Sequence, residues 1–181
     1  MLGAIWSHST LSRTQKVRIF SACVVAKLTY ALFAACLNQA ERRRIDGFQA
    51  QCLRKIYRVP PSYISTAGQL PLSEQICKQQ MLFMGKLARR PGTDPVRLSV
   101  FEPDSFDLRA PSGPRKRGRP RQSWGNMVMN NCLRVAGTPA RLAAYFRPEG
   151  GAARAWASAV QSWRTQCIFP PLLAHRLVQG F

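Results

Sequence analysis

The sequence predicts an all-α protein, in which a small helical bundle is followed by a basic Pro/Gly-rich connection and a short C-terminal helical segment. Three observations predict this fold class. Apolar residues recur at steps of three and four along several stretches, which is the period of one helix face. Capping signals and prolines stand at the ends of these stretches. No stretch alternates apolar and polar residues over the length of a strand, and no internal repeat is present.

The first helix is expected to begin near Ser12 and to include the apolar run 19–37. One stripe at helical spacing consists of Ile19, Cys23, Ala26, Tyr30, Phe33 and Leu37. The run approaches the length of a membrane span, but Lys27 lies at its centre, where a charge costs about 2.5 to 3.5 kcal/mol in a bilayer. We therefore expect a buried core helix here, not a membrane span.

The second helix is expected from Gln39 to Tyr57. Asn38 followed by Glu41 matches a capping box, in which each side chain binds a backbone N–H of the other residue. Pro60 and Pro61 stop the helix. Its apolar face is expected to comprise Ile45, Phe48, Cys52 and Ile56.

A third helix is predicted by an apolar stripe that ends at the basic pair Arg89 and Arg90, which suits the helix dipole. The stripe comprises Leu72, Ile76, Phe83 and Leu87, with Cys77, Met81, Met84 and Ala88 beside it. Two further helices are expected over 124–135 and 152–167, with Gly137, Pro139 and Pro148 in the stretch between them.

These elements predict four segments. Residues 11–90 form a helical nucleic-acid-binding bundle, and 91–123, where apolar periodicity disappears, form a flexible basic linker. Residues 124–169 form a C-terminal helical segment, and 170–181 form a tail.

The charge balance indicates a polyanionic partner. The chain has 27 Lys and Arg against 8 Asp and Glu, and a formal charge of +19. Such an excess attracts nucleic acids, but it also attracts anionic membranes and acidic proteins. The most basic segment is the strip Arg115, Lys116, Arg117, Gly118, Arg119, Pro120 and Arg121, a narrow strip with basic flanks that looks like the core of an AT-hook. Trp124 follows and is expected in the core.

Catalytic and metal-binding patterns are missing from the sequence. Glu102, Asp104 and Asp107 form the one acidic cluster, and we interpret it as a solvated turn in preference to a metal site. The six cysteines are widely spaced, without the pairs that hold zinc, and are expected to be reduced core residues. We expect no catalytic residue, metal, cofactor or small-molecule substrate, so this chain alone is not expected to be an enzyme.

Four motifs stand in a defined order: IWSHSTLSRTQKVRIFSACVVAKLTYAL, ERRRIDGFQAQCLRKIYRVP, MLFMGKLARRPGTDPVR and KRGRPRQSW. Together they resemble the region after the polymerase core in reverse transcriptases of non-LTR (LINE-type) retrotransposons, over about residues 2–124. The resemblance implies a thumb-proximal, C-terminal fragment or remnant that helps to hold template RNA and target DNA. The fingers and the palm, with its metal-binding pair of Asp residues, have no counterpart in this chain.

The sequence therefore predicts a non-catalytic RNA- and DNA-binding remnant that contacts phosphates. Two alternatives stay open: an AT-hook-like minor-groove binder, and an organelle-targeted or membrane-associated protein that uses the helix at 19–37. We expect a nuclear or cytoplasmic location; because no acidic residue precedes Glu41, mitochondrial or plastid targeting is the runner-up. The expected phosphate contacts are Arg42, Arg43, Arg44, Arg54, Lys55, Arg58, Arg89, Arg90, Arg115, Lys116, Arg117, Arg119 and Arg121.

Overall fold

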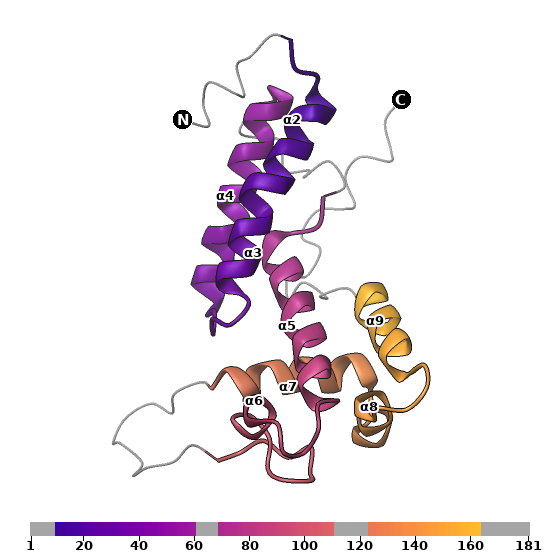
Figure 1. The fold of residues 1–181 in the computed structure, drawn as a ribbon. Helices are drawn as coiled ribbons and strands as arrows, with labels where there is room; N and C mark the ends of the chain where they lie inside the picture. The colour runs from indigo at the N-terminus through magenta and orange to yellow at the C-terminus, as the bar shows by residue number, and fades with distance from the viewer. Residues whose placement is uncertain (1–9, 61–68, 111–122, 164–181) are drawn as a thin grey trace, which may run out of the picture.

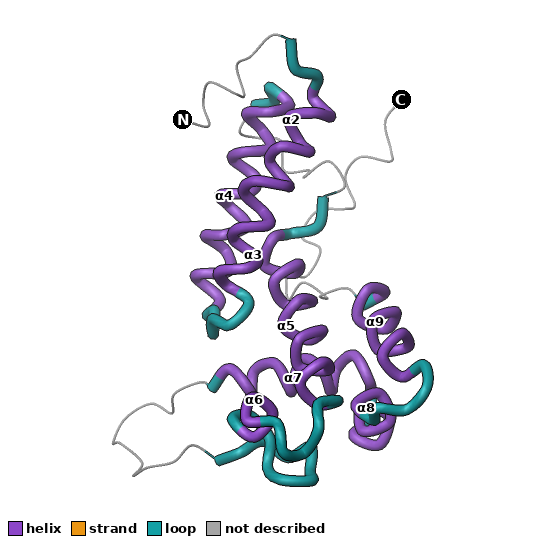
Figure 2. Tube along the Cα trace, in the orientation of Figure 1, coloured by secondary structure: helices purple, strands orange, loops and turns teal. Residues whose placement is uncertain are grey.

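The computed structural model describes residues 10–60, 69–110 and 123–163, and over these ranges the protein is all-α. Figure 2 shows helices joined by loops and turns. The β structure of the described residues is limited to an isolated bridge between Phe101 and Leu108. The fold class predicted from helical periodicity is confirmed.

The first long helix consists of three consecutive elements, α2 (Arg13–Phe20), the π-helical turn η1 (Ser21–Val25) and α3 (Ala26–Leu32). It begins where the sequence predicted, because Ser12 forms a capping box with Gln15: the Gln15 N–H donates to Ser12 Oγ at 3.2 Å and the Ser12 N–H to Gln15 Oε1 at 2.8 Å. Among the described residues, no helix is both long enough and apolar enough to cross a membrane.

The apolar stripe predicted for this helix is wrong as its core face. Phe20 and Val25 are buried, whereas Cys23 is exposed and Tyr30 is 80% exposed. The run is apolar on nearly every side, so periodicity could not choose among several stripes, and the π-helical turn then changes the register of the residues after Phe20. The side that packs inward carries Val17, Phe20, Val24, Val25, Leu28 and Leu32.

Helix α4 (Gln39–Tyr57) returns alongside the first helix as the second arm of a hairpin (Figure 1). Its predicted capping box is confirmed, since the Glu41 N–H donates to Asn38 Oδ1 at 2.9 Å and the Asn38 N–H donates to Glu41 Oε2 at 2.7 Å. Most of the predicted apolar face is confirmed, since Ile56 is buried and Ile45 and Cys52 pack partly buried against the same cluster. Phe48 is the exception at 40% exposed, and Gln49 and Leu53 are buried in addition. The helix ends at Arg58, whose φ of 56° is left-handed.

Helix α5 (Leu72–Ala88) joins two hydrophobic clusters (Figure 1). Leu72 and Ile76 pack with the hairpin of α2, η1, α3 and α4, and the residues from Cys77 to Ala88 pack with the helices that follow. The start of α5 is held by buried Gln49 of α4, which accepts from the Leu72 N–H at 2.7 Å and donates to the Leu70 carbonyl at 3.0 Å. The third predicted helix and most of its apolar stripe are confirmed.

The segment after α5 differs from the irregular connection expected for 91–123. Over 91–110 it carries the short helix α6 (Pro95–Leu98), which Asp94 caps, and it places Phe101 in the core. The guanidinium of buried Arg97 donates to the carbonyls of Ala88, Glu102 and Ser105, at 3.5, 3.4 and 2.7 Å. A buried Arg with three acceptors orders this loop, and low apolar periodicity gave no sign of it.

The second cluster is completed by α7 (Trp124–Ala136), α8 (Pro139–Phe146) and α9 (Ala152–Ser162). Helix α7 and the start of α9 agree with the prediction, but α9 is shorter than the expected 152–167. It ends at Ser162, and Trp163 after it has an extended backbone; residues 164–167 lie outside the described residues. Helix α8 was missed because Pro139 was interpreted as a break, although proline at the first position after a capping Thr138 favours a helix start. At the centre of this cluster, fully buried Trp156 of α9 donates to the Met81 carbonyl of α5 at 3.1 Å.

Candidate nucleic-acid interface

A basic face runs along the side of α4 that points away from the core. We define the basic face as Arg43, Arg44, Arg54, Lys55 and Arg58. Arg54 is half-buried and the other four residues are exposed. Because an α-helix rises 1.5 Å per residue, the face extends about 16 Å from Arg44 to Lys55. The buried residues Gln49, Leu53 and Ile56 hold its opposite side against the core.

The two carboxylates of α4 bind backbone and hydroxyl groups at helix starts. Glu41 binds the Asn38 N–H, and Asp46 accepts from the N–H and hydroxyl of Ser73 at 2.8 and 2.6 Å. In the described part of the chain, the side chains of Arg44, Arg54, Lys55 and Arg58 form no hydrogen bond or ion pair. Their charge is therefore available to an outside anion.

Three other predicted phosphate contacts are engaged inside the fold. Arg42 donates from Nε to the Leu37 carbonyl at 3.2 Å. Arg89 donates to the Tyr145 carbonyl at 3.1 Å, and burial lowers its pKa from the ordinary value. Arg90 forms an ion pair with Asp94 at 3.0 Å. Arg42 and Arg90 therefore bind acceptors nearby in the sequence, and Arg89 joins α5 to the C-terminal end of α8. Charge in the sequence alone does not show that these three guanidinium groups have acceptors within the protein.

The remaining predicted contacts belong to the strip after Pro114. Arg115, Lys116, Arg117, Arg119 and Arg121 lie outside the described residues. The structure therefore gives no position for the AT-hook-like strip. Its neighbour Trp124 is described, and as predicted it packs in the core, where its indole N–H donates to the Phe33 carbonyl at 3.0 Å and its ring meets Phe83 edge to face.

The acidic cluster forms a hydrogen-bonded turn. Asp107 accepts from the Ser105 hydroxyl at 2.6 Å, and Asp104 has a left-handed φ of 52°. Within 10–60, 69–110 and 123–163, no group of three or more His, Cys, Asp or Glu side chains is arranged to hold a metal ion.

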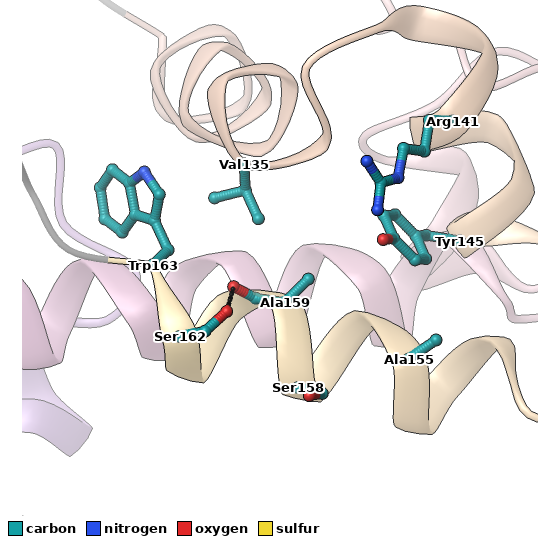
Figure 3. A pocket seen from close by; sticks show the side chains of 8 residues that line it. All are labelled: Val135, Arg141, Tyr145, Ala155, Ser158, Ala159, Ser162 and Trp163. Carbon is teal, nitrogen blue, oxygen red and sulfur yellow. Dashed lines mark hydrogen bonds between the residues drawn. The ribbon is translucent and has the colours of Figure 1, made fainter.

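An open pocket of about 480 Å³ lies among α7, α8 and α9 (Figure 3). Figure 3 shows Trp163 and Tyr145 toward opposite ends of it, with the Arg141 guanidinium 5.8 Å from the Tyr145 ring. Among the described residues, its lining carries no His, Cys, Asp or Glu side chain. The lining residues are Val135, Arg141, Tyr145, Ala155, Ser158, Ala159, Ser162 and Trp163.

The cysteines in the described ranges are free thiols in different environments. Cys77 and Cys132 are buried in the second cluster, and desolvation raises the pKa of both thiols. Cys23 is exposed on η1, which corrects the expectation that it lies in the core. A buried thiol with a raised pKa is a poor nucleophile, so Cys77 and Cys132 serve packing.

Sequence reasoning missed the exposure of Phe48, which it assigned to the core. The signal was present in the spacing, since Arg44, Phe48, Gln51 and Lys55 recur at steps of four, three and four and therefore share a stripe.

No protein-family model, curated protein or solved structure matches this chain.

Proposed function

We propose that this chain binds RNA or DNA without catalysis, through phosphate contacts made by the basic face of α4. The observation that carries the proposal is a set of cations on one helix in a chain of charge +19. Four of them, Arg44, Arg54, Lys55 and Arg58, form no hydrogen bond or ion pair among the described residues. Phosphate contacts from Arg and Lys supply most of the affinity of non-specific nucleic-acid binders.

We further propose that the chain derives from the region after the polymerase core of a non-LTR reverse transcriptase. The ordered motifs between residues 2 and 124 support this origin. Sequencing the genomic DNA upstream of the Met1 codon tests it. An in-frame or frameshifted polymerase palm with a pair of Asp residues would support the origin, and upstream DNA without any such remnant would count against it.

The binding proposal is tested with the full chain and a double variant of the basic face, Arg44→Gln with Lys55→Gln. Fluorescence anisotropy measures the affinity for labelled RNA and DNA oligonucleotides between about 50 and 200 mM salt. Removing one cation that neutralises a phosphate reduces the slope of log affinity against log salt by about 0.7 to 0.9, so the double variant should reduce it by about 1.5.

The matched control is Arg147→Gln with Arg154→Gln, which removes the same charge from two exposed residues at the α8 C-terminus and on α9. We expect this control to bind nearly as tightly as the unmodified chain. Equal weakening by both double variants would show that only total charge matters, and an unchanged salt slope in the α4 variant would refute the proposed interface.

A further inference from the structure

Phe48 is an exposed aromatic ring set among cations. Its side chain is 40% exposed, and it is not among the hydrophobic residues that form either core cluster. With 3.6 residues per turn, it lies within about 40° of Arg44 and about 20° of Lys55 around the helix axis. Arg44 is about 6 Å before it and Lys55 about 10 Å after it along that axis.

A core role does not account for this position. The inward side of α4 is occupied by Gln49, Leu53 and Ile56, which are at most 3% exposed. The hairpin packs through them, while Phe48 is 40% exposed. Leaving apolar area exposed forgoes about 25 cal/mol per Å², so a partner that covers the ring gains stability.

The cations select the kind of partner. A purely apolar partner would have to desolvate Arg44 and Lys55 without compensation, whereas a polyanion with flat apolar groups satisfies both the charges and the ring. Nucleic acids have this chemistry, but in a duplex each base is stacked between its neighbours and its faces are covered. Bases that lack a pairing strand can stack on an aromatic side chain.

We infer that the basic face binds single-stranded nucleic acid, with an unpaired base stacked on Phe48 and the flanking phosphates on Arg44 and Lys55. This inference rests on the proposed function and narrows it from nucleic acid in general to unpaired strands. Binding of this kind is expected to tolerate any base sequence, because every base has a π face.

The test measures the affinity of the full chain for oligo(dT), oligo(U) and a mixed-sequence DNA duplex of equal length at constant salt. Phe48→Ala should weaken binding of the single strands by about 5- to 20-fold and change duplex binding by less than about twofold. Phe48→Leu, which keeps an apolar side chain but has no ring, should behave like Phe48→Ala. Phe48→Tyr should retain the original affinity, since it preserves the stacking surface.

Two controls separate this effect from general changes. Tyr30→Ala removes an 80% exposed ring from α3 and should leave single-strand affinity unchanged. Circular dichroism and thermal melting of each variant verify the fold, and the exposed position of Phe48 predicts melting curves close to the original.

The two proposals fail in different ways. The stacking site is refuted if Phe48→Ala leaves the affinity for both single strands unchanged, or if it weakens single-strand and duplex binding equally. It is also refuted if Phe48→Leu retains the single-strand affinity of the original chain. An equal loss of single-strand affinity in Tyr30→Ala refutes it as well. The interface itself still stands in those cases if Arg44→Gln with Lys55→Gln weakens binding. A loss confined to oligo(dT) or to oligo(U) supports stacking and shows that the site distinguishes these two strands, which differ in the sugar 2′-hydroxyl and in the 5-methyl group of the base.

Discussion

Gly85 is the position where one added methyl group tests the packing of the second cluster most directly. It lies on α5 against the indole of Trp156, and a Cβ at this position would come within 2.5 Å of Trp156 Cδ1 and Nε1. The indole ring is held in place, because Trp156 is fully buried and its Nε1–H already donates to the Met81 carbonyl at 3.1 Å. In Gly85→Ala the indole must therefore move, and it must weaken this hydrogen bond as it does so.

The magnitude follows from three opposing contributions. Overpacking of a core costs about 1 to 3 kcal/mol, and weakening the indole hydrogen bond costs about 0.5 to 1.5 kcal/mol. Alanine in place of glycine inside a helix returns about 1 kcal/mol. We expect Gly85→Ala to lower the free energy of unfolding by about 0.5 to 3.5 kcal/mol, which for a chain of this size lowers Tm by about 1 to 14 °C.

Thermal melting followed by circular dichroism measures the change, and Gly47→Ala is the matched control. Gly47 lies within α4, where an added Cβ meets nothing within 4 Å. The same substitution should therefore raise stability there, by about 0.4 to 1 kcal/mol. If Gly85→Ala melts at or above the temperature of the unmodified protein, the close contact between α5 and Trp156 is not present in solution.

Two further predictions concern titratable groups. Iodoacetamide near pH 8 should alkylate exposed Cys23 at least about tenfold faster than buried Cys77 and Cys132, because burial raises the pKa of both buried thiols. Peptide mass spectrometry measures the alkylation rate of each cysteine in the folded protein, and equal rates would contradict the prediction. Desolvation acts to raise the pKa of Asp94, but backbone hydrogen bonds at the start of α6 and the Arg90 guanidinium outweigh it, so this pKa lies below its ordinary value. A lowered carboxyl pKa contributes stability above the unfolded value of about 3.9, which is lost as the pH falls through the lowered one. The gap in urea midpoint between the unmodified protein and Asp94→Asn should therefore be larger at pH 7 than near pH 3, and a gap that is constant with pH would refute this role.

Local signals in the sequence were enough to place most of the helices. The capping residues Ser12, Asn38 and Ser123 precede helices that begin where expected, because a side-chain cap acts on backbone groups two or three residues away. Most of the stripe predicted for α5 is correct, because polar residues separate its apolar positions over 72–80. The all-α class followed from the same short-range information.

For the first helix and at two positions of α4, only the tertiary structure decided which side chains face inward. The run at 19–37 is apolar all round, so only packing against α4, together with the π-helical turn, selected Phe20 and Val25 and left Tyr30 in water. On α4 the polar residue Gln49 is buried, because its amide binds the Leu70 carbonyl and the Leu72 N–H at the start of α5, 21 and 23 residues further along the chain.

For the candidate interface, too, some features followed from the sequence and others only from the tertiary structure. The sequence by itself determined that the chain is strongly basic and which Arg and Lys residues cluster along it. Only the fold separated Arg42, Arg89 and Arg90, which bind carbonyls or a carboxylate within the protein, from Arg44, Lys55 and Arg58, which point outward. The reason is that a cation's acceptor can lie anywhere along the chain, and its location depends on how distant segments pack.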